Sequence, residues 1–127
     1  MKIAHIALWT RRPDSLRDFY VRYFDGVSGE KYTNPAKGFE SYMLRFGDGC
    51  ELELMRRQDI TVQNEGEQLG LCHLAFDLGS RERVIALTER LRADGFRIAG
   101  ESRTTGDGYF ESVVLDPDGN RIELVTR

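Results

Sequence analysis

Hydrophobic and polar positions follow the same order twice along this chain, and the first round begins at residue 2. The apolar stretch 2–9 predicts a buried or half-buried strand. A stripe spaced by three and four residues then predicts an amphipathic helix, whose members are Leu16, Phe19, Tyr20, Tyr23 and Phe24. We expect Asp14 or Ser15 to cap the start of this helix, and Gly26 to end it in the left-handed conformation.

Strands are predicted to complete the first half. Residues 29–33 form a weak candidate, and 40–46 and 50–56 form stronger ones on either side of the turn Gly47-Asp48-Gly49. The polar residues 57–69 that follow indicate a linker.

The second half repeats this order. Its helix should begin at Ser80 and bury the stripe Val84, Leu87, Thr88 and Leu91. Its strands are predicted over 70–78, 96–101, 109–115 and 121–126, with a strong turn over 116–120 before the last of them. Each half therefore reads strand, helix, strand, strand, strand, which makes the chain an α+β protein.

The repeat is visible in the residues themselves. His5-Ile6-Ala7-Leu8 matches His73-Leu74-Ala75-Phe76, 68 positions later, and Leu52-Glu53-Leu54-Met55 matches Ile122-Glu123-Leu124-Val125, 70 positions later. A period of this length is too long for a solenoid repeat, so we expect two fused modules that face each other.

The only two histidines fall at matched places in the repeat, and glutamates recur there too. Because strand side chains alternate between faces, His5 and His73 lie opposite the apolar set of their strands, as do Glu51, Glu53 and Glu123. If the modules face each other, both histidines and one or two glutamates from each module meet in one cleft. Two imidazoles with carboxylates suit a divalent ion such as Zn, Ni, Co, Mn or Fe.

Composition removes several other classes of protein. The chain has 127 residues, enough for one domain, and its 18 basic and 21 acidic residues give a net charge of -3, so nothing favours nucleic acid or an anionic membrane as a partner. No apolar run reaches the roughly 18–20 residues of a membrane helix, and the N-terminus lacks a signal-peptide pattern. We therefore expect a cytoplasmic protein in which Cys50 and Cys72 are free, buried and unreactive thiols.

Five segments together resemble the vicinal oxygen chelate (VOC) superfamily, and within it the small glyoxalase I-like proteins related to lactoylglutathione lyase. They are IAHIAL, FYVRYFDG, ELELM, LCHLAFDL and DPDGNRIELV, in this order along the chain. The resemblance implies the glyoxalase/bleomycin resistance/dihydroxybiphenyl dioxygenase fold. It implies a single VOC domain over 1–127, built from two βαβββ modules at about 1–60 and 70–127 that a polar linker joins.

The resemblance also implies a site and a reaction. His5, Glu53, His73 and Glu123 would be the ligands of a divalent ion, Zn or Ni before Co, Mn or Fe, and Glu53 is preferred to Glu51 because it matches Glu123 in the repeat. The implied substrate is a small molecule with two neighbouring oxygens, such as the hemithioacetal of methylglyoxal with glutathione or another thiol. Glu123 would be the catalytic base with Glu53 as its partner, and a homodimer is expected.

Two departures from glyoxalase I leave the substrate open. Trp9 stands where those enzymes place a basic residue that holds a glutathione carboxylate, and Arg56 and Arg57 stand where they carry an asparagine. Arginines elsewhere could replace that contact, with Arg11, Arg12, Arg45 and Arg57 as the candidates. Trp9 itself could line the cleft or pack in the core or an interface.

Other members of the superfamily stay as alternatives. Ring-cleaving dioxygenases and fosfomycin-type thiol transferases use two histidines and one glutamate, and Glu53 argues against both. Epimerases often have a glutamine ligand, which is absent here. Binding or resistance proteins without catalysis have lost the metal ligands, whereas this chain keeps all four candidates.

Overall fold

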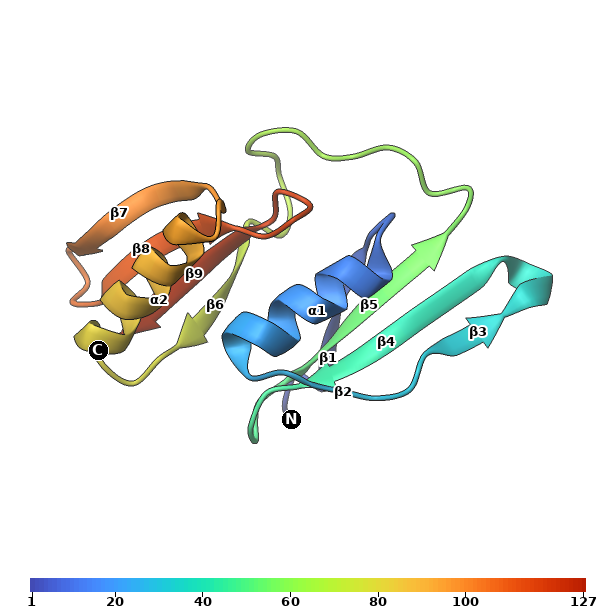
Figure 1. Cartoon of the computed structure of the whole chain (residues 1–127), viewed down its shortest axis with the longest axis horizontal. Helices are drawn as coiled ribbons and strands as arrows, with labels where there is room; N and C mark the ends of the chain where they lie inside the picture. Colours follow the sequence, from blue (N-terminus) through green and yellow to red (C-terminus); the bar gives the residue numbers. More distant parts are fainter. The chain divides into compact units, whose positions relative to one another are not determined.

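The structure, a computed structural model that describes residues 1–127, consists of two units, Met1–Gln63 and Asn64–Arg127. Each unit is a sheet with one helix across one of its faces, as Figure 1 shows. This arrangement confirms the predicted α+β class and the two βαβββ modules. Neither helix has the length and apolar character needed to span a membrane.

Unit 1 contains one long helix, a short 3-10 turn and five strands. These are β1 (His5–Trp9), α1 (Pro13–Phe24), β2 (Val27–Ser28), β3 (Tyr32–Asn34), η1 (Pro35–Lys37), β4 (Phe39–Arg45) and β5 (Glu51–Arg57). The sheet order is β1-β5-β4-β2, with β3 also paired to β4, and β1 runs parallel to β5. The single strand expected over 29–33 is wrong in detail, because the chain forms two short strands on either side of residues 29–31, β2 before them and β3 after them.

The core of unit 1 lies between α1 and the sheet. The helical stripe predicted from the sequence is buried throughout, and Leu16 and Tyr20 are fully inaccessible. The sheet contributes Leu44 from β4 and Leu54 from β5, which are also fully inaccessible. Burial of this apolar surface is what holds helix and sheet together.

Both ends of α1 differ from expectation. Arg12 is the N-cap residue and makes no side-chain cap, because Pro13 occupies the first turn and its fixed φ starts the helix earlier than Asp14 or Ser15 would. At the other end the left-handed residue is Asp25, with φ of 54°, and not Gly26. Gly26 is required for a different reason, since a Cβ there would lie 2.9 Å from the Phe46 ring.

Unit 2 repeats the plan with one helix and four strands. They are β6 (His73–Asp77), α2 (Arg81–Ala93), β7 (Ile98–Thr104), β8 (Phe110–Leu115) and β9 (Arg121–Thr126). The order is β6-β9-β8-β7, and β6 runs parallel to β9 as β1 does to β5. The Ser80 hydroxyl accepts a hydrogen bond from the Arg83 amide at 3.2 Å, which confirms the predicted cap.

The core of unit 2 lies between α2 and its sheet. Val84 and Leu91 of α2 and Ile122 and Leu124 of β9 are fully inaccessible. Below α2, the hydroxyls of Thr88 and Ser112 are hydrogen-bonded at 2.7 Å, so this polar pair is satisfied inside the core.

The cysteines are not the buried pair that strand alternation suggested. Cys50 is half-buried and Cys72 is exposed, and both are free thiols. The prediction was wrong because each cysteine lies just before its strand begins, β5 at Glu51 and β6 at His73, so the alternation of the strand does not yet apply.

Candidate metal centre

The parallel strand pairs place a histidine and a glutamate on the same face of each sheet. In unit 1, β1 and β5 pair Ala7 with Glu53, so His5 lies two residues back on the same face. The opposite face carries Leu52 and Leu54, which are buried under α1. We call the side away from the helix the helix-free face of each unit.

In unit 1, His5 and Glu53 approach each other across this face. The distance from His5 Nε2 to Glu53 Oε2 is 4.0 Å, and the side chains are 49% and 20% exposed. Glu51 is the direct register partner of His5, but its carboxylate faces Arg45, at 4.0 Å from Nε. The geometry therefore distinguishes the two glutamates that the sequence left open: Glu53 faces the histidine and Glu51 faces an arginine.

Unit 2 repeats the pair at the same register. β6 and β9 pair Ala75 with Glu123, so His73 again lies two residues back on the helix-free face. His73 Nε2 lies 3.2 Å from Glu123 Oε2, and the side chains are 38% and 20% exposed. The direct register partner of His73 is Arg121, where unit 1 has a glutamate.

These pairs fit the donor set of a divalent ion. Nitrogen and oxygen ligands about 2.1 Å from one ion, at angles of 90–110°, lie roughly 3–3.5 Å apart. The 3.2 Å pair of unit 2 is within this range, and the 4.0 Å pair of unit 1 is slightly wider. No group of three or more histidine, cysteine, aspartate or glutamate side chains comes together, and each unit places one histidine beside one glutamate.

Trp9 has an arginine beside its ring. Trp9 lies on the helix-free face of unit 1, with the Arg57 guanidinium carbon 5.2 Å from its ring centre. Arg57 is held in turn by Asp59, with Nε to Oδ1 at 2.5 Å, and this hydrogen bond raises the pKa of Arg57. A cation is therefore present beside Trp9, but it comes from β5 and already has a carboxylate partner.

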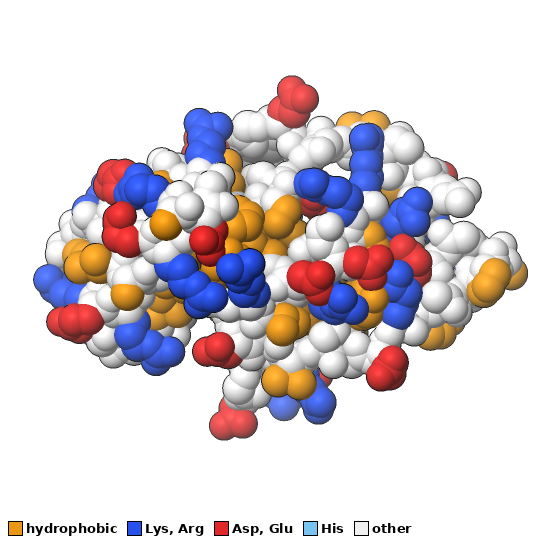
Figure 2. Space-filling model, in the orientation of Figure 1, with side chains coloured by type: hydrophobic (Ala, Val, Ile, Leu, Met, Phe, Trp, Pro, Cys, Tyr) orange, Lys and Arg blue, Asp and Glu red, His pale blue; other side chains and the backbone are white.

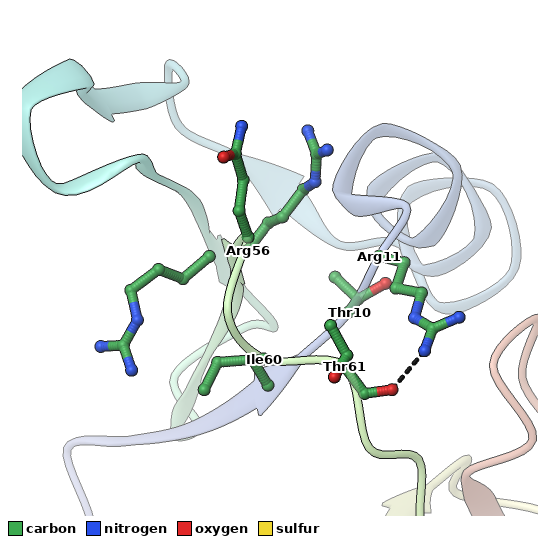
Figure 3. A pocket seen from close by; sticks show the side chains of 7 residues that line it. Thr10, Arg11, Arg56, Ile60 and Thr61 are labelled. Carbon is green, nitrogen blue, oxygen red and sulfur yellow. Dashed lines mark hydrogen bonds between the residues drawn. The ribbon is translucent and has the colours of Figure 1, made fainter.

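The other candidate arginines are also engaged. Arg11 donates a hydrogen bond to the Thr61 carbonyl, as Figure 3 shows, and Arg45 faces Glu51. Arg12 begins α1. A hollow of about 270 Å³ lies beside Arg11 at the ends of β1 and β5. Its lining residues are Thr10, Arg11, Arg56, Arg57, Gln58, Ile60 and Thr61.

Charged side chains of both signs are interspersed on the face of the molecule drawn in Figure 2. Within each unit, the visible lysines and arginines lie among aspartates and glutamates. This distribution agrees with the small net charge of -3.

The comparison with known families agrees with this fold. Residues 2–124 match the sequence profile of the Glyoxalase/Bleomycin resistance protein/Dioxygenase superfamily. The chain belongs to this superfamily. VOC proteins commonly use a divalent metal ion, and many of them are enzymes.

Two of the VOC relatives match this chain over nearly their whole length, and a third is much longer. The uncharacterized protein YqjT of Bacillus subtilis is 28% identical in an alignment of 126 positions that covers 95% of each chain. The glyoxalase family protein from Enterococcus faecalis has a TM-score of 0.76 at 27% identity, over 98% of this chain and 97% of that one. Glyoxalase I from Zea mays has a TM-score of 0.81 at 22% identity, over 99% of this chain but 44% of its own. The present chain thus spans less than half of the maize enzyme, and that likeness shows the fold alone.

Sequence reasoning missed the apolar side chains that share the helix-free face of unit 1 with His5 and Glu53. Strand alternation carried one step further would have found Met43 and Met55, which share the helix-free face with Glu53. Phe39 lay outside the predicted strand 40–46, although β4 begins with it. The Arg57–Asp59 pair had no sequence signal, because it forms where the chain leaves the sheet.

Proposed function

We propose that this VOC protein is a metal-dependent lyase of the glyoxalase I type, in which His5, Glu53, His73 and Glu123 hold one divalent ion. The observation that carries the proposal is the His–Glu pair that recurs at the same register in both units. Zn or Ni is the first expectation for the ion, and Co, Mn and Fe suit the same donors. The two pairs of one site come either from one chain or from the two chains of a homodimer.

A divalent ion bound there would supply Lewis-acid stabilisation of negative charge on two neighbouring substrate oxygens. The two histidines would bind the ion through ring nitrogens, and the two carboxylates would balance its charge. Glu53 and Glu123 are each only 20% exposed, so neither carboxylate is freely solvated. Such carboxylates are suited to accept a proton from carbon.

The proposed reaction is an isomerisation that needs no other reactant. Glu123 takes the proton from the carbon that carries the sulfur of a hemithioacetal and returns it to the neighbouring carbonyl carbon, while Glu53 stays in place. The first carbon is thereby oxidised to a thioester, and the second is reduced to an alcohol. The hydroxyl proton of the first carbon moves to the oxygen of the second, so atoms and electrons balance.

The proposed substrate class is a small vicinal-oxygen compound, such as the adduct of methylglyoxal with a thiol. Glutathione is the thiol expected in a cytoplasmic setting, but Trp9 and Arg57 differ from the residues that hold its carboxylate in glyoxalase I. These two positions favour a related VOC enzyme with another thiol or substrate as the second candidate. A dioxygenase, an epimerase, a thiol transferase and a binding protein without catalysis would each fail to form thioester.

Metal analysis of the purified protein tests the proposal. The wild type should hold about one ion for each set of four ligands, and His5→Ala and Glu123→Gln should lower that content after dialysis. Glu51→Gln is the matched control, because this carboxylate lies on the same face but is directed at Arg45. A wild type that takes up no metal on reconstitution would exclude the enzyme and leave the binding protein.

A further inference from the structure

The hollow at the ends of β1 and β5 is lined by arginines and hydroxyls, and no carboxylate lines it. Its volume of about 270 Å³ gives room for a phosphate group with a few attached atoms. Figure 3 shows that Arg11 and Arg56 belong to different segments of its wall, Arg11 to the residues after β1 and Arg56 to β5. A polar hollow with cationic walls favours an anion as its ligand.

Strand pairing sets this hollow apart from the proposed metal centre. The amide of Thr10 donates to the Met55 carbonyl at 2.8 Å, so the pairing of β1 with β5 continues by one residue and brings Thr10 beside Arg56. By strand alternation both side chains lie on the face that carries α1, whereas His5 and Glu53 lie on the helix-free face. Arg56 is also three residues from Glu53 along β5, about 10 Å. A ligand in the hollow is therefore separate from a ligand of the metal ion.

Arg11 and Arg56 keep much of their positive charge. Arg11 donates a hydrogen bond to the carbonyl oxygen of Thr61, which is a neutral partner. Arg56 Nη1 lies 3.4 Å from Glu40 Oε1, but the same carboxylate also has the Lys31 ammonium 3.5 Å from Oε2. One full and one partly balanced cation thus remain for an anion to neutralise.

Hydroxyl groups add hydrogen-bond donors to the two guanidiniums. Thr10 is only 7% exposed, and its oxygen accepts the Arg12 amide at 3.0 Å, so its own hydrogen is available to donate. Thr61 adds a second hydroxyl from the chain that leaves β5. Arg57 already has the carboxylate of Asp59 as its partner, and we assign it no part in binding. Two guanidiniums and two hydroxyls can therefore donate to the oxygens of one anion.

Unit 2 has neither arginine, although its backbone follows the same path at this place. The amide of Leu78 donates to the Val125 carbonyl at 2.8 Å, as the amide of Thr10 donates in unit 1. The next residue is Gly79 in place of one arginine, and Thr126 of β9 stands in place of the other. The arginines are thus a property of unit 1 and not a requirement of the fold.

We propose that this hollow is a second binding site, which takes the phosphate group of a small molecule between Arg11 and Arg56. The guanidinium fork matches the oxygens of phosphate, and its hydrogen bonds to charged oxygens are about twice as strong as those between neutral groups. A carboxylate has two oxygens and a single charge, so it satisfies fewer of these donors. The size of the hollow and the net charge of -3 favour a small molecule over a nucleic acid.

One wall of the hollow is the first turn of the chain after β5. The amide of Ile60 donates to the Arg57 carbonyl at 3.1 Å, and Arg11 holds the next residue, Thr61. A phosphate bound to Arg11 and to the Thr61 hydroxyl would join this turn to the end of β1. Occupancy of the site should therefore slow hydrogen exchange at the amides of residues 58–62.

Titration calorimetry of the purified protein with inorganic phosphate tests the proposal. The wild type should bind about one phosphate per chain, and acetate should bind at least about tenfold more weakly. Arg11→Met and Arg56→Met keep a long side chain without its charge, and each should weaken phosphate binding by at least about tenfold. Arg22→Met is the matched control, because Arg22 belongs to α1 of the same unit and does not line the hollow. It should change the affinity by less than about twofold.

The variant His5→Ala distinguishes the hollow from the metal centre. Phosphate in the hollow should bind this variant as it binds the wild type. Binding that is lost in His5→Ala but kept in Arg11→Met would assign the phosphate to the metal ion and overturn the inference. No binding in the wild type, equal affinities for phosphate and acetate, or unchanged affinity in both arginine variants would also overturn it.

Hydrogen exchange gives a second readout, with circular dichroism as the check that each variant folds. Phosphate should slow exchange at residues 58–62 in the wild type and not in Arg11→Met. Equal exchange with and without saturating phosphate in the wild type would place the anion outside the hollow and contradict the proposal. The outcome is independent of the proposed function, since a protein that binds phosphate here but holds no metal would keep this site and lose the enzyme proposal.

Discussion

The two units share a backbone plan but place different side chains around the same ligand pair. In both, a histidine on the first strand faces a glutamate on the last, two register steps apart. Beside this pair, unit 1 has Glu51 and Trp9, whereas unit 2 has Arg121 and Asp77. The part of the repeat that stays the same is thus the donor set, and the part that differs is its neighbourhood.

The units also connect helix to sheet differently at one equivalent position. In unit 1, Tyr42 of β4 donates a hydrogen bond to Asp14 of α1 at 2.5 Å. In unit 2, Ser112 of β8 shares a hydrogen bond with Thr88 of α2. Tyr42 pairs with Leu54 and Ser112 pairs with Leu124, so the two links occupy the same place in their sheets. The link in unit 1 contains the carboxyl group of Asp14, which titrates, whereas the link in unit 2 joins two hydroxyls, which do not.

The largest expected effect is on enzyme activity, and it distinguishes the proposed roles of Glu123 and Glu53. Glu123→Gln removes the proposed base and should lower hemithioacetal isomerase activity by about 10²–10⁴-fold at equal metal content. Glu53→Gln keeps that base and should act mainly through metal affinity, so excess metal should restore part of its activity. Thioester formation followed by absorbance, at several metal concentrations, measures both. Full rescue of Glu123→Gln by metal would reverse the two roles.

The next largest effect is on the free energy of unfolding, and it allows the hydrophobic cores of the two units to be compared. Leu54→Ala in unit 1 and Leu124→Ala in unit 2 truncate side chains that are fully inaccessible and lie at matched positions of β5 and β9. Each should lower the free energy of unfolding by about 2–5 kcal/mol, because each leaves a cavity under a helix. Urea denaturation measures this, with the exposed Ile85→Ala as a control that should change it little. A loss of unfolding free energy below about 1 kcal/mol in either unit would show that the neighbouring core side chains move in to fill the cavity.

Particular residues show how much of the fold and of the candidate site could be predicted from the sequence. The stripes that begin at Leu16 and Val84 predicted both helices, because apolar spacing reflects the burial that stabilises them. The duplication around His5 and His73 predicted that histidine and glutamate share a face. The cap of α1 was mispredicted because the fixed φ of Pro13 outweighs the capping preference of Asp14. Contacts such as Arg57 with Asp59 depend on where a loop turns, which no local pattern encodes.

A smaller effect compares the starts of the two helices. Ser80→Ala removes the only hydroxyl cap of α2 and should cost about 1 kcal/mol of unfolding free energy. Ser80→Asp keeps an acceptor and should cost little. Arg12→Ser in unit 1 offers α1 a cap that it lacks and should be neutral to slightly stabilising. Urea denaturation of the three variants measures their order of stability. A destabilised Arg12→Ser variant would contradict the expected order.

The smallest effect is the pH response of the helix-to-sheet link. The hydrogen bond from Tyr42 and the nearby Lys31 ammonium lower the pKa of Asp14 in the folded protein. The link therefore contributes its full stability above the ordinary aspartate pKa of 3.8 and loses it as the pH falls through the lowered value. Asp14 is 60% exposed, so solvent screening limits the effect to less than about 1 kcal/mol.

Hydrogen exchange measures this difference between the units. It should show β4 opening in acid before β8, whose Thr88–Ser112 link does not titrate, and Asp14→Asn should remove that difference. Equal acid sensitivity of β4 and β8 in the wild type would mean that the link is not what distinguishes the two units.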